Sequence, residues 1–371
     1  MPLSHSHHLT FLLRDAYRYA DVVWARWRRR RPRTLPTLLL FVTYRCNLQC
    51  AMCGVRYQPR NRELDLADYQ NILDRAQRLH CSLMLVSGGE ALARGDVVYE
   101  LIRMGRERGI AAHLCSNGLL IDEKAARRLQ ESGLRSVSIS LESPDRDVHD
   151  RIRGAGSYDQ AVAALTLLRI HAPQVQTGIN CTLTALNYRH LAAWPPFAES
   201  LGAHQLKFAP VHVNLLHREK PPEEFAPLQF SDDQLTALAE EIVELRQALK
   251  KSRLLTNHPR YLKHLAASIR KAPSFNCYAG YAACTIDPYG NVSPCPDLDA
   301  GLSLHEQPLD AIWRGDAYHA LRQRVCTCGR GCWDPLYTEM SLRLAPTSVW
   351  RGVRQVWRER QFYFGAPAKT D

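Results

Sequence analysis

Long hydrophobic segments are missing from this 371-residue sequence. A membrane-spanning helix needs about 20 consecutive apolar residues, and no run approaches that length. The first 30 residues contain short apolar patches that Arg and Asp interrupt, which is not the pattern of a secretory signal. Since hydrophobic residues still make up 46% of the chain and charged residues 23%, we expect a globular protein of the reducing cytoplasm.

Acidic residues are scarce at the two ends of the chain. Residues 1–36 contain eight Arg against two Asp, and residues 346–371 contain four Arg and one Lys against two acids. Both ends also contain Trp, and residues 9–27 fit one amphipathic helix. We favour two terminal helices that pack on the body of the protein. A peripheral contact with the inner face of the membrane is the second interpretation, and nucleic-acid binding is the least favoured.

Twelve cysteines are present, a high number for a chain without an export signal. In a reducing compartment cysteines bind metals more often than they form structural disulfides. Nine of them fall into three groups, at positions 46–53, 277–295 and 326–332, which predicts metal ligation. The other three stand alone in the sequence, and we expect buried, inert side chains for Cys81, Cys115 and Cys181.

Six strand-like runs alternate with helical segments between residues 37 and 210. This repeat indicates parallel strands with right-handed crossovers, and six units fit an open barrel better than a closed eight-fold one. We therefore predict an α/β fold, a partial (β/α)6 barrel with a small Cys-rich C-terminal α+β extension. The expected strands are Leu38–Thr43, Leu83–Ser87, Ile110–Cys115, Ser136–Ser140, Gly178–Thr182 and Gln205–Phe208, and the expected helices lie near 66–79, 96–108, 122–132, 158–171 and 188–201.

The chain divides at polar and Pro-rich connectors. The expected units are a basic amphipathic helix at 1–36, the barrel at 37–230, connecting helices at 231–275, a Cys-rich domain at 276–345 and a basic aromatic tail at 346–371. Within the Cys-rich domain, the sequence Asp-Pro-Tyr-Gly-Asn at 287–291 predicts a hairpin turn. In parallel sheets ligands bind at the carboxyl ends of the strands, where the motifs of the barrel fall.

The first cysteine group directly follows the first expected strand. Cys46, Cys50 and Cys53 form a C-x3-C-x2-C loop, and three thiolates so close together can hold one face of a cubane iron–sulfur cluster. Three ligands leave one iron open, and an open metal position can bind a small chelating molecule. The alternative is a zinc site, which needs a fourth ligand and more often uses paired C-x2-C elements.

With this loop after the first strand, residues 37–210 resemble the radical S-adenosylmethionine (SAM) superfamily, and a second motif extends the resemblance to about residue 335. The resemblance implies a [4Fe–4S] cluster whose open iron binds the amino and carboxylate groups of SAM. It also implies an electron donor such as flavodoxin or ferredoxin. Reductive cleavage of SAM then gives a 5′-deoxyadenosyl radical, which abstracts a hydrogen atom from substrate.

Further motifs end the following strands and resemble the SAM-binding segments of that superfamily. Gly88-Gly89-Glu90 matches the stretch that holds the methionine amino group, although a plain strand-to-helix turn would also explain it. Arg153 can pair with the methionine carboxylate in fork geometry, with a surface salt bridge as the alternative. The candidate SAM-binding residues are Gly88, Gly89, Glu90, Asn117, Ser140, Glu142 and Arg153, and no residue stands out as a catalytic base.

The later cysteines form a second motif. Cys277-x6-Cys284-x10-Cys295 followed by Cys326-x-Cys328-x3-Cys332 resembles the auxiliary iron–sulfur extension called SPASM, or its shorter form, twitch. The full SPASM set has seven cysteines, whereas residues 277–332 offer six, so one auxiliary [4Fe–4S] cluster is the better fit. The expected ligands are Cys277, Cys284, Cys295 and Cys332, with Cys328 in reserve and Cys326 least favoured; a structural zinc site is the alternative.

Together these motifs predict a radical SAM enzyme with SAM, an electron donor and an unidentified substrate as partners. The first choice is an oxidoreductase-type reaction on a small-molecule, glycan or lipid intermediate, because an auxiliary cluster can accept an electron from a substrate radical. The rival enzyme function is peptide modification, as in maturases of ribosomal peptides or sulfatases, including thioether formation. The alternative outside enzymes is an iron–sulfur or zinc scaffold, or a redox sensor, without turnover.

Overall fold

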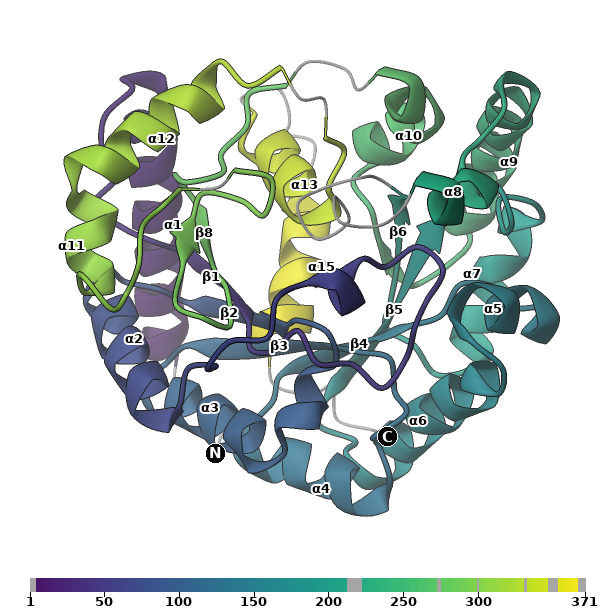
Figure 1. Ribbon diagram of the computed structural model, residues 1–371, viewed down its shortest axis with the longest axis horizontal. Coiled ribbons are helices and arrows are strands. Elements are labelled where there is room, and N and C mark those ends of the chain that lie inside the picture. Colours follow the sequence, from purple (N-terminus) through teal and green to yellow (C-terminus); the bar gives the residue numbers. More distant parts are fainter. Residues whose placement is uncertain are drawn as a thin grey trace.

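The sheet is a single open layer that curves most of the way round a barrel (Figure 1). The computed structural model describes residues 5–211, 222–271, 275–298, 300–329, 332–345 and 353–365. In these residues the strand order is β7-β6-β5-β4-β3-β2-β1-β8-β9, with β8 and β9 as the antiparallel pair. The predicted partial barrel is confirmed. The strands are β1 (Thr37–Phe41), β2 (Leu83–Ser87), β3 (Ala111–Ser116), β4 (Ser136–Ser140), β5 (Gln176–Leu183), β6 (Gln205–Pro210), β7 (Leu255–Thr256), β8 (Ala283–Ile286) and β9 (Val292–Ser293).

Helices cover the outer face of the sheet (Figure 1). Acidic N-caps fix where several begin, because the side chains of Asp65, Asp122 and Asp145 accept hydrogen bonds from the first backbone N–H groups. The helices of the barrel repeat are α2 (Leu66–Arg78), α3 (Asp96–Glu107), α4 (Glu123–Ser132), α5 (Arg146–Arg153), α6 (Ser157–His171) and α7 (Trp194–Ser200), followed by α8 (Pro222–Phe225), α9 (Asp232–Lys250) and α10 (Pro259–Lys271). Short 3-10 turns are η1 (Val55–Tyr57), η2 (Ala91–Arg94), η3 (Leu191–Ala193) and η5 (Ala226–Leu228).

The two faces of the sheet differ in polarity. Alternate strand residues such as Leu38 and Leu40 belong to the main apolar core with the covering helices. The opposite face of the middle strands carries polar side chains. Examples are His113 beside Ser136 and Asn180 beside Lys207, which are in register on neighbouring strands. The polar side chains of this inner face need hydrogen-bond partners or water. In this protein part of the inner face lies against the C-terminal part of the chain.

Two C-terminal helices enter the barrel, α13 (Pro335–Leu344) and α15 (Val353–Phe364) (Figure 1). Glu339 of α13 pairs with Lys207 of β6 and, at 2.5 Å, with Arg343, which also contacts Glu359 of α15 at 2.6 Å. The His113 ring lies 5.2 Å from the ring of Tyr363. For the described part of the tail, these contacts agree with the interpretation that the terminal helices pack on the barrel.

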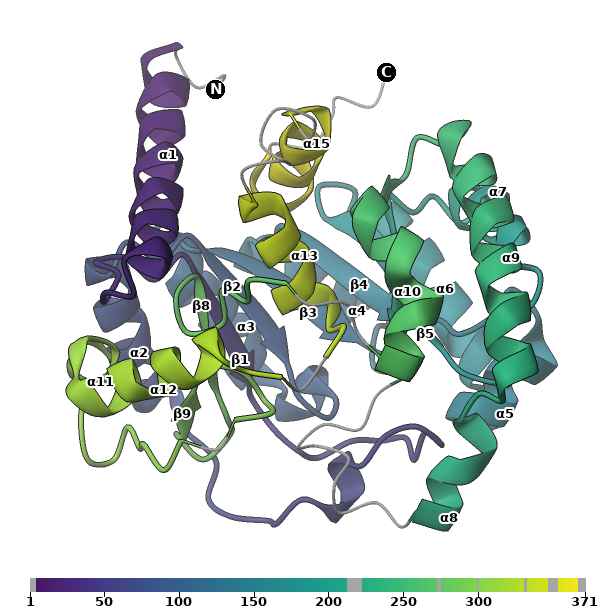
Figure 2. The ribbon, with the colours of Figure 1, turned by 90° about the horizontal axis from the view of Figure 1, so that it is seen from above.

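The Cys-rich extension is attached directly to the barrel sheet. Its strand β8 is parallel to β1, with Leu38 opposite Cys284, and the predicted turn joins β8 to β9. The sequence did not predict that this hairpin continues the barrel. The helices α11 (Leu309–Arg314) and α12 (Asp316–Cys326) complete the extension, and the long N-terminal helix α1 (His5–Trp27) stands beside it (Figure 2). None of the described helices is long and apolar enough to cross a membrane.

Candidate iron–sulfur sites

The first cysteine loop lies at the carboxyl end of β1, where the sheet motifs converge. Cys46, Cys50 and Cys53 are free thiols, and Cys50 is buried. The loop is joined to α5 by a hydrogen bond of 2.7 Å from the Ala51 N–H to the Ile152 carbonyl. Burial raises the pKa of the Cys46 and Cys53 thiols. Because burial disfavours the thiolates, a bound cationic metal centre fits this loop by supplying the missing positive charge.

The Gly88-Gly89 turn after β2 packs tightly against the cysteine loop. Gly89 donates its N–H to the Thr43 carbonyl at 2.7 Å, and Glu90 donates to the Arg45 carbonyl at 2.9 Å. A Cβ atom on Gly88 would lie 2.3 Å from the Thr43 oxygen, and one on Gly89 would lie 2.3 Å from the Arg45 oxygen. Glycine at both positions is therefore what lets the two loops meet.

Glu90 is fully buried, and both oxygens of its carboxylate accept hydrogen bonds from other groups of the protein. One carboxylate oxygen accepts from the Ser116 hydroxyl at 2.9 Å and the Leu92 N–H at 3.1 Å, and the other accepts from the Asn117 N–H at 2.8 Å. The Asn117 amide then donates to Asn47 in the cysteine loop at 2.7 Å and points to the Cys46 sulfur at 4.0 Å. Glu90 thus orients Asn117, while its predicted contact with the methionine amino group stays a prediction.

Arg153, the last residue of α5, lies between a buried acid and the cysteine loop. Its guanidinium binds Glu142 through Nε at 2.8 Å and Nη2 at 2.6 Å, and Nη1 points to the Cys50 sulfur at 3.7 Å. The second Glu142 oxygen accepts from the Thr182 N–H at 2.5 Å. Burial raises the pKa of the Glu142 carboxyl, and the Arg153 charge opposes that rise. The ion pair is largely buried rather than on the surface, and the predicted contact of Arg153 with the methionine carboxylate stays a prediction.

The remaining SAM candidate, Ser140, ends β4 in register with Asn180 of β5 and is partly exposed. Ser140 lies at the same edge of the sheet as the cysteine loop. Its contact with SAM remains a prediction. The isolated cysteines differ in burial, since Cys81 and Cys181 are buried and Cys115 is partly exposed. Burial raises the pKa of Cys81 and Cys115 to about 12, which agrees with inert thiols.

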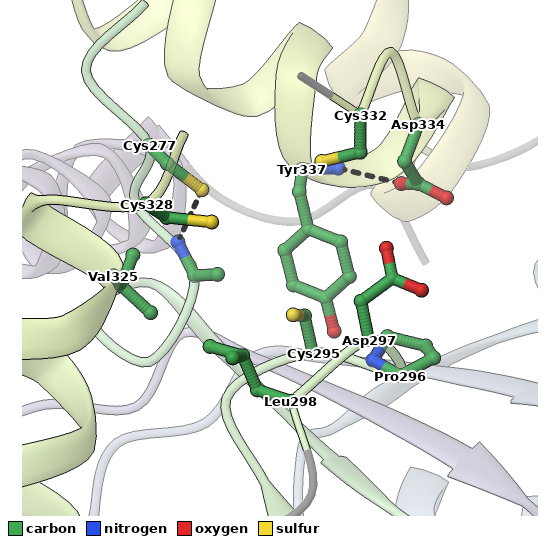
Figure 3. Close-up of a pocket in the computed structure, with 11 residues that line it drawn as sticks. Cys277, Cys295, Pro296, Asp297, Leu298, Val325, Cys328, Cys332, Asp334 and Tyr337 are labelled. Carbon is green, nitrogen blue, oxygen red and sulfur yellow. Dashed lines mark hydrogen bonds between the residues drawn. The ribbon is translucent and has the colours of Figure 1, made fainter. Parts of the chain in front are cut away.

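The later cysteines meet in a cavity between the sheet and the C-terminal helices (Figure 3). The side chains of Cys277, Cys295, Cys328 and Cys332 line it, which is the number of thiolates that a fully ligated [4Fe–4S] cluster takes. Burial raises the pKa of Cys277 to about 11 and that of Cys295 to about 12. As at the first loop, buried thiols here fit a metal centre that stabilises their deprotonated form.

Two expected candidates do not reach this cavity. Cys284 lies in β8 between Ala283 and Thr285, and strand alternation turns its side chain to the helix-covered face, where it is fully buried in the main core. This corrects the sequence expectation, which ranked Cys284 above Cys328. Cys326 also lies outside the cavity lining, and its sulfur is 3.4 Å from the Tyr281 hydroxyl.

Besides the cysteines, the cavity lining includes three residues with titratable side chains that sequence analysis did not single out, namely Asp297, Asp334 and Tyr337. Asp334 caps α13 by accepting from the Leu336 N–H at 2.8 Å and from the Tyr337 N–H at 3.0 Å, the second of which is drawn in Figure 3. The Tyr337 hydroxyl is 2.6 Å from that of Thr285. The Asp-Pro pair at 334–335 is a helix-start signal that could have located α13. No comparable sequence signal marks Asp297.

Comparisons with known proteins identify the class. Residues 40–184 match the family described as the Radical SAM superfamily, and residues 277–333 match SPASM, an iron-sulfur cluster-binding domain. The mycofactocin maturase MftC of Mycolicibacterium smegmatis is 30% identical over 292 residues, which cover 76% of this chain and 71% of that protein. An AdoMet-dependent heme synthase of Nitratidesulfovibrio vulgaris is 28% identical over 313 residues, covering 76% and 82%.

Solved structures show the same fold. Streptococcus suis SuiB bound to S-adenosylmethionine has a TM-score of 0.62 at 18% identity, covering 78% of this chain and 68% of that one. The chain described here belongs to the radical SAM superfamily and carries a SPASM domain. It is a radical SAM enzyme with a SAM-binding [4Fe–4S] cluster and an auxiliary cluster. The SAM-binding cluster supplies the electron for reductive cleavage of SAM.

The Gly89 contact can be tested with a single methyl group. In Gly89→Ala the new Cβ would collide with the Arg45 carbonyl, so we expect about 1–3 kcal/mol of destabilisation and a displaced cysteine loop. Iron content after anaerobic reconstitution should fall by up to half, because the cluster at the cysteine loop is lost while the auxiliary cluster stays. Gly109→Ala is the control for backbone strain, because Gly109 has a φ of +71° that disfavours a side chain while a Cβ there meets nothing within 4 Å; it should cost some stability but keep both clusters. Equal iron content in both variants would contradict the proposed packing role.

The Glu142–Arg153 pair can be tested by a double-mutant cycle. Arg153→Met leaves a buried carboxylate without its cation, and we expect a loss of about 3 kcal/mol in the free energy of unfolding. Adding Glu142→Met should recover much of that loss, because no charge then remains buried. The exposed pair Glu123 and Arg127 provides the control, in which the same changes should have little effect. Additive effects at the buried pair would exclude the coupling.

Proposed function

We propose that this enzyme modifies a peptide substrate, acting as a maturase. The observation that carries the proposal is its 30% identity to the mycofactocin maturase MftC over most of both chains. A PqqA peptide cyclase of Granulibacter bethesdensis is also 28% identical over 297 residues. Among structures with the same fold, SuiB was solved with the precursor peptide SuiA and anSMEcpe with the Cp18Cys peptide. These relatives favour the alternative from sequence analysis over its first choice, oxidation of a small molecule, glycan or lipid.

The roles proposed for the cysteines follow from the two sites. Cys46, Cys50 and Cys53 hold the SAM-binding cluster, with Gly88, Gly89 and Arg153 supporting the loop that carries them. The auxiliary cluster is held by Cys277, Cys295, Cys328 and Cys332, and Cys284 serves the apolar core. This assignment is supported by the cavity that the four thiols share and by the orientation of Cys284 away from it.

An auxiliary cluster beside the barrel supports redox-coupled peptide chemistry, in which a substrate radical loses one electron and one proton after hydrogen abstraction. An external carrier such as flavodoxin or ferredoxin is proposed as the source of the electron for SAM cleavage. A peripheral membrane contact through the chain ends remains a separate hypothesis. Residues 1–4, 346–352 and 366–371 of these ends lie outside the described residues, as do the side chains of residues 5–13 and 353–356.

The ligand assignment predicts opposite results for two cysteines. Cys328→Ala should lower the iron content from about eight to about four atoms per chain, because a cluster normally takes all four thiolates. Cys284→Ala should keep about eight atoms, with a loss of stability from the cavity left in the core. Iron and sulfide analysis together with EPR of the reduced protein provides the measurement. Loss of the second cluster in Cys284→Ala alone would reverse the assignment.

The substrate class can be determined from the origin of the hydrogen atom that the 5′-deoxyadenosyl radical abstracts. The reconstituted enzyme is incubated with dithionite, SAM and a pool of synthetic peptides deuterated on their side chains, and separately with deuterated sugars and lipids. We expect deuterium in the 5′-deoxyadenosine only with the peptide pool, as measured by mass spectrometry. A chain with Cys46, Cys50 and Cys53 replaced by Ala is the control without cleavage. Deuterium transfer from the sugar or lipid pool alone would refute peptide modification.

A further inference from the structure

The base of helix α1 presents a basic aromatic surface that the enzyme's own fold does not use. We define the α1 patch as Trp24, Trp27, Arg28, Arg29 and Arg30. Trp24 and Trp27 are 52% and 67% exposed, and their ring centroids lie 5.3 Å apart. The Arg28 guanidinium lies over both rings, at 4.8 and 4.5 Å from their centroids. The three arginines are exposed, so the patch combines two large rings with concentrated positive charge.

The acidic side chains of the same segment are partly buried and have partners within the protein. Asp15 binds Arg18 at 2.5 Å, and Asp21 accepts from the N–H groups of Arg33 and Thr34 at 2.8 Å. None of the exposed residues between 14 and 33 is a carboxylate. Beside the patch, the exposed Asp316 of the extension pairs with Arg31. The outer face of this segment is therefore positive and complementary to an acidic partner.

The inner side of the same helix lies against the auxiliary site. Val22 and Ala25 are buried in a small cluster with Tyr281. Arg26 donates from Nε to the Cys277 carbonyl at 2.9 Å, and Cys277 is one of the four cysteines that line the cavity. Arg26 immediately precedes Trp27 in the chain. Trp27 of the α1 patch is thus the chain neighbour of a residue whose side chain contacts the backbone of a proposed cluster ligand.

We propose that the α1 patch is the docking site of a small acidic one-electron carrier protein, which exchanges an electron with the auxiliary cluster behind it. The idea rests on the proposed function through the ligand assignment of that cluster. In turnover the cluster would pass the electron that it takes from the substrate radical to the semiquinone of a flavodoxin, which becomes the hydroquinone. The experiment runs the same step in the reducing direction, in which the hydroquinone loses one electron and becomes the semiquinone. The cluster gains that electron and passes from the 2+ to the 1+ state, so charge and electrons balance.

A protein partner fits this surface better than a lipid surface does. Trp and Arg are the residues most enriched at the energetic centres of protein interfaces, and electron-transfer complexes need only small contact areas. A helix that lies in a membrane instead buries a continuous apolar face. Here the apolar residues Val22 and Ala25 are used against the extension, and Arg28 lies over the outer rings.

The experiment follows reduction of the reconstituted enzyme by flavodoxin hydroquinone in a stopped-flow instrument. The chain with Cys46, Cys50 and Cys53 replaced by Ala restricts the signal to the auxiliary cluster. Charge reversal in Arg28→Glu/Arg30→Glu should lower the bimolecular rate constant by about 10-fold or more and flatten its dependence on salt. Lys124→Glu/Lys263→Glu reverses two exposed charges elsewhere and should leave the rate unchanged.

Two further measurements keep the test independent of folding and of substrate class. Reduction by dithionite should be equally fast in all variants, since it needs no docking, and Trp27→Ala should slow only the flavodoxin reaction. No peptide is present, so an error in the proposed substrate leaves these results unchanged. Equal flavodoxin rates in the patch and control variants would overturn the proposal. So would patch-dependent binding to phosphatidylglycerol vesicles with no effect on flavodoxin, which would assign the surface to a membrane.

Discussion

The Gly89 N–H and the Thr43 carbonyl form the hydrogen bond on which the order of the SAM-binding side depends. It ties the turn after β2 to the loop after β1, and the absence of a Cβ on Gly88 and Gly89 allows that approach. Glu90 then extends the contact to the end of β3 through Ser116 and Asn117. Three consecutive strand ends are thus fixed relative to the cysteines, largely by backbone groups and a buried carboxylate.

The sequence was most informative where one local pattern decides the structure. The six barrel strands and the C-x3-C-x2-C loop were predicted because alternation and spacing are local properties. The burial of Cys284 in the main core was not expected, because spacing alone says nothing about the face of β8 on which a side chain lies. That orientation is set by the pairing of β8 with β1, a contact between residues more than 240 positions apart. The contact of Arg153 with the Cys50 sulfur, 103 positions away, was missed for the same reason.

The charged side chains at the two ends of the chain differ in their contacts. In α15 the acidic Glu359 pairs with Arg343 of α13, which continues the ionic contacts of Lys207 and Glu339. A buried ionic network of this kind specifies one packing arrangement more than it adds stability. In α1 the arginines after Trp27 stay on the surface. Composition alone treats the two ends alike, and only the tertiary contacts separate a structural role from an available surface.

The two cysteine sites share one apolar cluster, which constrains how they can work together. Phe41 and Tyr44 lead into the SAM-binding loop and pack in the same cluster as Tyr337 of the auxiliary cavity, with Cys46, Cys53, Cys277 and Cys295 at its margin. Apolar surroundings of this kind strengthen electrostatic interactions between the sites. The pairing of β1 with β8 holds this cluster in place, so the hairpin that extends the barrel also sets the geometry between the two redox centres.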